Sequence, residues 1–493
     1  MKKFTFNHIS IFIIFIAVVL LTSCATTKKS TDLRPQQAKT VTILAVNDMH
    51  AAIDNFPRFG YMVDSLRAIY PDLLLVSAGD SQTGNPINDQ YPEKGMPIIE
   101  LMNMLKFDLS AVGNHEFDTK PDGFANILKK SEFDHICGNV EVENTKKYPI
   151  KPYKIITTTN GVRVAFASVL DINPTGIPDT HPENVKGFKF LDPVETAKKH
   201  LKLKDSADVL IYLTHYGFEN DVKLANLFPK GVVDVIIGGH SHTKIEKEQL
   251  HNGVLITQAE RKLKYATLLK LSVDATGKVS KSMELLTVDN EGKERADLRA
   301  KVDEFNNNPA MRVRIAEAAD DFKNYEQIGY LMVDALRVST GTDIALINPG
   351  GVRIDRLPKG AVSVMDIYSM DPFGNEIVLF KLTGHELMSL IKNAYSFDEY
   401  LPIYPSGMKT KYLLGKDGEV KTVELFDTKG KPMDLNKVYT VSMNNYMASV
   451  YVFDHKDPGT GLFRPTAESI IDYLKELKYI PSYKNEKRVE IVR

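Results

Sequence analysis

Five short apolar segments in the first half of the chain end directly in polar side chains, and this pattern constrains the fold more than any other feature. Such short, largely apolar or β-branched runs predict strands that are buried on both faces. The segments are Thr42–Val46, Leu73–Ala78, Leu109–Val112, Val209–Leu213 and Val233–Ile237. Apolar residues at spacings of three and four predict a helix after the first strand, and they are Phe59, Met62, Val63, Leu66 and Ile69. Strands and helices in this arrangement predict a layered α/β fold.

The side chains that follow these segments are suited to bind metal ions. They supply carboxylate, imidazole and amide donors without a thiolate, and they are Asp48, His50, Asp80, Asn114, His215, His240 and His242. In layered α/β folds, functional residues gather beyond the carboxyl ends of the strands. Donors of this kind suit zinc, manganese or iron, and seven are too many for one tetrahedral ion. We therefore expect two divalent ions roughly 3.5–4 Å apart, with Asp80 as the bridging ligand.

The alternative is that each polar residue stands there for an unrelated reason. A lone histidine after a strand is usually a surface or core residue, and the Asp48-x-His50 pair alone is weak evidence. The segment Gly113-Asn114-His115-Glu116 is more specific, because asparagine is a rare ligand and glycine permits a tight turn. Five such strand ends in one chain rarely arise by coincidence.

Several of these segments resemble the motifs of the calcineurin-like metallophosphoesterases. They are Asn47-Asp48-Met49-His50, Gly79-Asp80, Gly113-Asn114-His115-Glu116-Phe117-Asp118, Thr214-His215 and Gly238-Gly239-His240-Ser241-His242. The hexapeptide at 113–118 and the segment GFKFLDPVE at 187–195 resemble, more narrowly, the bacterial 5′-nucleotidase, UDP-sugar hydrolase and 2′,3′-cyclic phosphodiesterase family. The resemblance implies an α/β fold: a four-layer metallophosphoesterase domain, with two β-sheets flanked by helices, and then a smaller α/β substrate-binding domain.

The resemblance also implies a role for each metal-binding residue. One ion would be held by Asp48, His50, Asp80 and His242, and the other by Asp80, Asn114, His215 and His240. Members of the family often carry glutamine where His242 stands, and histidine there is the usual choice in the wider superfamily. Zinc and manganese are the ions we expect. Two divalent cations activate water and neutralise the oxygens of a phosphoryl group.

His115 and Asp118 stand three residues apart and form the predicted catalytic dyad. The resemblance implies that Asp118 orients His115, which either stabilises the transition state or protonates the leaving alkoxide. The alternative for Asp118 is a helix N-cap or a solvated acid.

The second half of the chain is predicted to bind the substrate. The charged stretch Glu294–Met311 predicts a helix between two lobes, and Ile328–Leu336 predicts a helix that Gly341 terminates. Ile344–Ile347 predicts a strand that runs into a glycine-rich segment ending in an arginine. Glycines at a strand end let the backbone approach a ligand, and an arginine there can hold a phosphate.

The family resemblance assigns four residues of this half to the substrate. Arg353 would contact the phosphate with Asn348 beside it, and Phe373 and Tyr446 would stack on either side of a nucleobase. The alternative is that the two aromatic residues only pack in the core. Two family features are missing: the Gly-Gly-Asp-Gly-Phe segment is replaced by 449–453 (SVYVF), and a second arginine shortly before Gly329 is not obvious, although Lys323 is nearby.

The N-terminus resembles the signal of a bacterial lipoprotein. Lys2 and Lys3 precede an apolar run too short to span a membrane comfortably, and the run ends in a Leu-Thr-Ser-Cys sequence at Cys24. This pattern predicts cleavage before Cys24 and lipid attachment to its sulfur, which would place the protein in the bacterial cell envelope, on the periplasmic or surface side. A signal anchor or a plain secreted protein is the alternative. The other cysteine, Cys137, lies in an apolar context that predicts a buried core residue.

Together these patterns predict five regions. They are a signal peptide at 1–23, a flexible tether at 24–40, the metallophosphoesterase domain at 41–290, a linker helix at 291–320 and the substrate-binding domain at 321–493.

The predicted activity is hydrolysis of phosphate esters, above all nucleotides, outside the cytoplasm. Three other activities are alternatives on the same scaffold: cleavage of 2′,3′-cyclic nucleotides, of UDP-sugars or of sulfur esters. An alternative from another class is a surface lipoprotein that binds nucleotides without catalysis. A formal net charge of −1 gives the whole protein no positive electrostatic potential that would hold a nucleic acid polymer. We expect a monomer whose lobes rotate to bring the substrate to the metals.

Overall fold

The structure is a computed structural model that describes residues 38–492. The predicted signal peptide, the predicted lipidation site at Cys24 and nearly all of the predicted tether lie outside these residues. Within the described part of the chain, no helix has both the length and the apolar character needed to cross a membrane.

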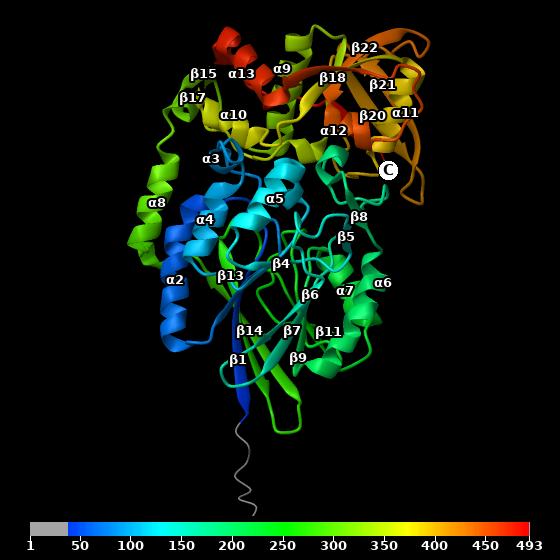
Figure 1. The fold of residues 1–493 in the computed structure, drawn as a ribbon. Helices are drawn as coiled ribbons and strands as arrows, with labels where there is room; N and C mark the ends of the chain where they lie inside the picture. The colour runs from blue at the N-terminus through cyan, green and yellow to red at the C-terminus, as the bar shows by residue number, and fades with distance from the viewer. Residues whose placement is uncertain (1–37, 493) are drawn as a thin grey trace, which may run out of the picture.

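Two six-stranded mixed sheets form the centre of the first domain (Figure 1). The first has the order β14 (Val279–Thr287), β13 (Tyr265–Val273), β1 (Lys39–Val46), β2 (Leu74–Ser77), β3 (Leu109–Ala111) and β4 (Asp134–Ile136). The second has the order β11 (Gln249–His251), β12 (Val254–Thr257), β10 (Val235–Ile237), β9 (Val209–Leu213), β7 (Arg163–Ala167) and β6 (Tyr153–Thr157). Strands β1 to β4 run parallel to one another, as do β7, β9, β10 and β12. Their carboxyl ends therefore meet at one edge of each sheet.

The two sheets pack face to face, and helices cover their outer faces. Alternate residues of β1 divide between two cores: Ile43 packs between the sheets, whereas Leu44 packs under the helices of the first sheet. That outer face is covered by α2 (Phe56–Ile69), α4 (Met96–Met104) and α8 (Ala296–Asn306), and the other by α6 (Pro193–His200) and α7 (Phe218–Leu227) (Figure 1). The predicted four-layer arrangement is confirmed.

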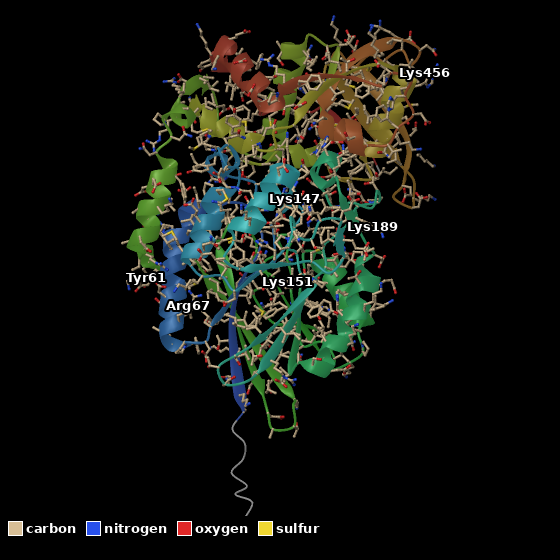
Figure 2. All side chains as sticks on the ribbon, in the orientation of Figure 1. Tyr61, Arg67, Lys147, Lys151, Lys189 and Lys456 are labelled. Atoms are coloured by element: carbon tan, nitrogen blue, oxygen red, sulfur yellow. The ribbon has the colours of Figure 1, made fainter. Side chains whose placement is uncertain are left out.

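All five predicted strands are present, within three residues of their predicted limits. The predicted helix is α2, whose inner face buries Phe59, Met62 and Val63, while Tyr61 lies on its solvent side (Figure 2). The apolar spacing also placed Ile69 on this inner face, but Ile69, the last residue of α2, is 66% exposed.

The second domain has three sheets. A five-stranded sheet has the order β19 (Tyr404–Ser406), β16 (Ile344–Ile347), β22 (Val438–Asn444), β18 (Glu376–Thr383) and β23 (Thr460–Pro465). One three-stranded sheet has the order β17 (Gly360–Ser363), β15 (Arg314–Ala318) and β24 (Tyr479–Ile480). The other three-stranded sheet has the order β21 (Val420–Asp427), β20 (Met408–Leu414) and β25 (Val489–Val492). The helices include α9 (Tyr325–Thr340), α10 (Val364–Met370), α11 (Gly384–Ala394), α12 (Asn445–Val450) and α13 (Thr466–Leu477).

The predicted helix and strand of this half are found as α9 and β16. Gly341 ends α9 with φ 65°, a left-handed conformation that glycine adopts without strain. The region predicted as a linker, 291–320, contains α8, which packs on the first domain, and β15, which pairs with strands of the second. The second domain lies over the end of the first at which the parallel strands finish (Figure 1).

Candidate metal centre

The seven predicted ligands meet where the parallel strands of the two sheets end. Backbone hydrogen bonds connect the loops that carry them: Asp48 N donates to the carbonyl oxygen of Gly79 at 3.0 Å, and His50 N to that of Asp80 at 3.0 Å. Five of the seven are buried, and His240 and His242 are partly exposed. A Cβ atom on Gly113 would collide with the Asp80 carboxylate, which explains why glycine precedes Asn114.

Five of these residues have left-handed backbone conformations, which non-glycine residues rarely adopt. The φ angles of Asp48, His50, Asp80, His240 and His242 are 47°, 45°, 52°, 77° and 55°. Each such residue costs of order 1–3 kcal/mol, and the strain concentrates at functional sites. The strand-end turns therefore direct the side chains toward one point at the expense of local stability.

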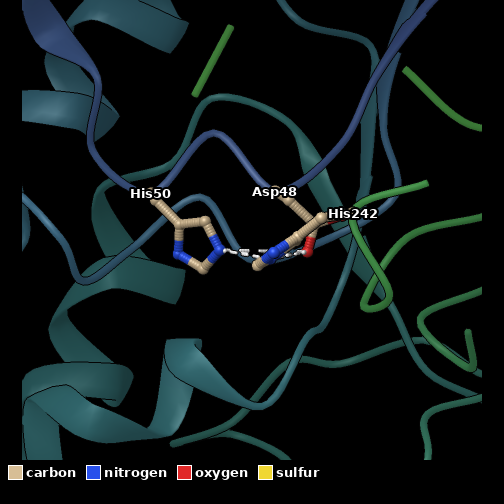
Figure 3. Close-up of side chains that lie close together, drawn as sticks. All are labelled: Asp48, His50 and His242. Atoms are coloured by element: carbon tan, nitrogen blue, oxygen red, sulfur yellow. Dashed lines mark hydrogen bonds and ion pairs between the residues drawn. The ribbon is translucent and has the colours of Figure 1, made fainter. Parts of the chain in front are cut away.

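Asp48, His50 and His242 form the first close group (Figure 3). The two histidine Nε2 atoms are 2.9 Å apart, and Asp48 Oδ1 is 3.4 Å from His242 Nε2. His50 Nδ1 donates to the carbonyl oxygen of Thr83 at 3.0 Å, so its Nε2 lone pair faces the group. A ligating histidine is usually fixed in this way through its other nitrogen.

Asp48, Asp80 and His215 form the second close group. His215 Nδ1 donates to the carbonyl oxygen of Ala78 at 2.8 Å, and its Nε2 lies 3.1 Å from Asp80 Oδ2. That Nε2 is fully buried and faces Asp80 without a hydrogen bond of good geometry among the described residues, which fits a nitrogen that binds a metal ion. Burial lowers the pKa of His215, but Asp80 and Asp48 raise it to about 10, so the two carboxylates favour positive charge at this point.

Asn114 and His240 lie next to each other beside this second group. His240 Nδ1 is 3.1 Å from Asn114 Oδ1, and Asn114 Nδ2 donates to the carbonyl oxygen of Asp179 at 3.0 Å, which orients the amide. The His240 ring is 5.1 Å from that of His215. His240 is thus in the centre but belongs to none of the tightly spaced groups of three.

Asp171 is a residue of the centre that was not predicted. Its Oδ2 lies 3.6 Å from His240 Nε2, on the side of the ring opposite Asn114. Asp171 follows β7 after three further buried residues, Ser168–Leu170. A sixth strand end followed by an acidic residue was therefore the signal in the sequence. A carboxylate behind a ligating histidine fixes the ring and raises its basicity.

We expect Asp171→Ala to weaken metal binding about 10- to 100-fold, because His240 loses the group that orients it. A chelator competition titration measures the affinity without turnover. Asp179→Ala is the matched control, since it removes a neighbouring negative charge but keeps the backbone carbonyl that holds Asn114. Equal losses in both variants would mean that only the local charge matters.

His115 and Asp118 are joined by a short hydrogen bond. Both lie on the 3₁₀ turn η2 (His115–Thr119), where residues three apart face the same side. His115 Nδ1 donates to Asp118 Oδ2 at 2.6 Å, and Asp118 also accepts hydrogen bonds from the hydroxyl groups of Thr83 at 2.9 Å and Thr180 at 2.8 Å. Asp118 caps no helix in this arrangement. His115 Nε2 is 3.9 Å from Asp80 Oδ2, which brings the dyad to the metal centre.

Glu116 connects the loops that follow β2 and β3. Its carboxylate accepts hydrogen bonds from the backbone N–H groups of Gly113 at 2.7 Å, Ser81 at 2.7 Å and Asp80 at 3.0 Å. Burial and the nearby charge of Asp80 raise the pKa of Glu116 to about 7. Its place in the Gly-Asn-His-Glu motif marked it in the sequence, but this structural role was not predicted.

The four predicted substrate residues line one cavity together with the metal centre. This cavity has a volume of about 980 Å³, and its walls include Asn348, Arg353, Phe373 and Tyr446 from the second domain. The Phe373 ring stacks on His115 with centroids 5.9 Å apart, and the Arg353 guanidinium lies 5.5 Å from the centre of the Phe373 ring.

The segment 449–453, which departs from the family pattern, contributes Val450, Tyr451 and Phe453 to the core of the second domain, whereas Ser449 and Val452 are exposed. Tyr451 is buried and stacks on Phe397 at 4.2 Å with the rings nearly parallel. Lys323 is exposed and does not line the cavity. A different cation, Arg261 of the first domain, donates a hydrogen bond to the Tyr325 hydroxyl at 3.2 Å. The guanidinium group of Arg261 is close enough to that of Arg353 for the two charges to interact.

Comparison with known proteins identifies both domains. Residues 41–244 match the calcineurin-like phosphoesterase family, and residues 302–451 match the 5′-nucleotidase C-terminal domain. Such phosphoesterases use a dinuclear site for divalent metals. The fold and the donor set are therefore those of a calcineurin-like phosphoesterase domain. With both matches in one chain, the protein belongs to the two-domain 5′-nucleotidase family.

Relatives with similarity over most of the chain support this assignment. The endonuclease YhcR of Bacillus subtilis is 29% identical over 93% of the chain, and UshA of Escherichia coli is 25% identical over 88% of the chain and 90% of its own length. The chain spans only 41% of the length of YhcR. The crystal structure of a 5′-nucleotidase precursor from Thermus thermophilus has a TM-score of 0.81 at 28% identity, and the match covers 92% of this chain and all of that one.

Proposed function

We propose that the protein hydrolyses phosphate monoesters of nucleotides at a dinuclear metal centre. The proposal rests on one cavity that is lined by four of the seven donors, by the His115–Asp118 dyad and by Arg353. The other three donors, Asp48, His50 and His215, lie in close groups with Asp80 or His242. Asp48, His50, Asp80 and His242 would hold one ion, and Asp80, Asn114, His215 and His240 the other. The fully buried Nε2 of His215, which faces Asp80 without a hydrogen bond of good geometry, supports this assignment.

The two cations would supply an activated water molecule and neutralise charge on the phosphoryl oxygens. The chain itself supplies three further functions. Arg353 would bind the phosphoryl group through its guanidinium fork. His115 would face the leaving oxygen with Nε2, because its Nδ1–H is held by Asp118. Phe373 and Tyr446 would contact the nucleobase, with stacking worth roughly 1–3 kcal/mol per base.

The finer parts of the assignment are also proposals. Zinc or manganese is the expected metal, because the donors are imidazole, carboxylate and amide groups. The N-terminal sequence supports a lipid anchor at Cys24 that would hold the enzyme in the bacterial cell envelope. We propose that it acts there as a monomer on small phosphate esters.

Metal removal tests the proposal directly. Protein treated with a chelator should lose phosphate release from nucleoside monophosphates, and added Zn²⁺ or Mn²⁺ should restore it. Assays with 2′,3′-cyclic nucleotides, UDP-sugars and an aryl phosphate identify the preferred ester. Activity that survives chelation with no bound metal would refute the mechanism, and binding of nucleotides without turnover in the metal-loaded protein would favour the non-catalytic alternative.

A further inference from the structure

The chain between β12 and β13 crosses from the second sheet of the first domain to the first sheet. This crossing segment, residues 258–264, carries none of the seven predicted metal ligands. Three of its residues nevertheless have left-handed backbone conformations: Glu260, Lys262 and Leu263, with φ angles of 58°, 57° and 53°. Such conformations are uncommon outside glycine, and strain of this kind concentrates at functional sites.

Gln258, the first residue of the crossing segment, holds the histidine loop, residues 239–242, through its side chain. The side chain is buried, and its Nε2 donates to the carbonyl oxygen of Gly239 at 2.9 Å. Its Oε1 accepts hydrogen bonds from the backbone N–H of Thr243 and from the Ser241 hydroxyl, the latter at 3.1 Å. A carbonyl acceptor on one side and an N–H donor on the other fix the orientation of the amide group.

The backbone of the crossing segment closes the base of the same loop. Gly238 N, just before the loop, donates to the carbonyl oxygen of Thr257 at 2.8 Å. Ile245 N, shortly after the loop, donates to the carbonyl oxygen of Gln258 at 3.1 Å. Both ends of the histidine loop are therefore attached to two consecutive residues, and the Gln258 side chain lies between these ends.

The peptide group between Gly239 and His240 is held from two sides. Its carbonyl oxygen accepts the hydrogen bond from Gln258, and its N–H donates to Asp48 Oδ2 at 3.0 Å. A Cβ atom on Gly239 would lie 2.9 Å from His215 Nδ1, so the loop packs directly against another predicted ligand. The hydrogen bond from Gln258 thus determines how the loop approaches the ligands that follow β1 and β9.

The crossing segment is also attached to the first sheet through Asn47, which directly follows β1. Asn47 Oδ1 accepts a hydrogen bond from Ala259 N at 2.7 Å, and its Nδ2 donates to the carbonyl oxygen of Glu260 at 2.7 Å. The same Nδ2 donates to Asp48 Oδ2 at 2.6 Å. Neighbouring residues of the crossing segment, Gln258 and Ala259, therefore hold ligand-bearing loops of both sheets.

We propose that Gln258 is a positioning residue of the metal centre, which holds the Gly239–His240 peptide and thereby directs His240 and His242 toward the two ions. This inference rests on the proposed function, in which one of these histidines serves each ion. Gln258 is not itself a proposed ligand. Its loss should nevertheless weaken the binding of both ions, whereas loss of His242 removes a ligand from one.

Gln258→Leu tests this role, because leucine is of similar size and forms no hydrogen bond with the loop. Chelator competition on the Zn²⁺-loaded protein should show both dissociation constants raised about 10- to 100-fold, the usual cost of losing a group that orients a ligand. Thr257→Val is the matched control, since Thr257 is the adjacent residue, is equally buried, and has a hydroxyl without a hydrogen-bond partner among the described residues. It should bind both ions like the parent. Unchanged affinities in Gln258→Leu, a loss confined to one ion, or equal losses in both variants would overturn the proposal.

Ser241→Ala provides a second test that does not depend on the folding of Gln258→Leu. Ser241 is exposed, lies between the two histidines, and donates to Gln258 Oε1. The metal affinity should fall about 2- to 10-fold, the usual effect of one hydrogen bond. In the Gln258→Leu background the same change should cost much less, because the partner of the hydroxyl is already gone. Full additivity of the two losses would contradict the proposal.

Thermal unfolding separates positioning of the ligands from support of the fold. A residue that only supported the fold would lower the Tm of the metal-free protein and leave the metal affinities of the folded variant unchanged. For Gln258→Leu we expect Zn²⁺ to raise the Tm less than in the parent and in Thr257→Val. An equal rise would refute the role of Gln258 even in an active enzyme. Because neither measurement needs turnover, absence of phosphate release would refute only the proposed hydrolysis.

Discussion

Replacement of Asp80 by alanine is expected to abolish phosphate release, with kcat/KM reduced by at least about 10⁴-fold, at or beyond the upper limit for loss of a general acid. Asp80 contacts both the predicted metal ligand His215 and the dyad residue His115. Its Oδ2 lies 3.1 Å from His215 Nε2 and 3.9 Å from His115 Nε2, while Oδ1 accepts a hydrogen bond from His115 N at 2.9 Å. Burial raises the pKa of Asp80, but the nearby His215, His115 and His50 lower it well below its usual range, so the side chain is a carboxylate.

The same variant should also lose bound metal. Elemental analysis of the purified protein measures the stoichiometry, and we expect it to fall from two ions to one or none. The matched control is Asp234→Ala, which removes a buried carboxylate at the opposite, amino end of β10, where it pairs with Lys204 at 2.8 Å. That variant should be less stable but active. Full activity in Asp80→Ala would refute the dinuclear mechanism.

Much of the first domain could be predicted from sequence because its strands are short, apolar and followed at once by polar residues. The runs of apolar residues predict the first and last residues of β9 and β16 correctly, because strands buried on both faces need apolar side chains at every position. It does not indicate that His50 and His242, which are 192 positions apart, place their Nε2 atoms 2.9 Å from each other. That proximity depends on how the two sheets pack, which only the family resemblance anticipated.

Other features of the site have no recognisable local pattern in the sequence. The left-handed conformations of Asp48 and His240 are imposed by the loops around them, because neither residue type requires such a backbone. Asp171 was missed because it follows β7 at a distance, after three residues outside the strand. The lipid anchor remains a prediction from sequence.

Replacement of His115 by asparagine is expected to lower kcat for nucleoside monophosphates by roughly 10²–10⁴-fold, the usual contribution of a general acid. The size of the loss should depend on the leaving group. A nucleoside leaves as a basic alkoxide that needs a proton, whereas 4-nitrophenyl phosphate releases a stable phenolate that does not. If His115 Nε2 donates that proton, the variant should lose far less activity on the aryl phosphate than on the nucleotide.

Parallel assays of the two substrates distinguish the two roles predicted for His115. An equal loss on both would show that the side chain stabilises charge on the phosphoryl group and protonates nothing. Asp118→Asn supplies the control, because asparagine can still accept the hydrogen bond from His115 Nδ1 but does not carry the negative charge that favours a protonated ring. The threonines at 83 and 180 would continue to hold that side chain in place. Asp118→Asn should therefore show the same dependence on the leaving group with a smaller loss, since the histidine is still positioned but is a weaker acid–base partner.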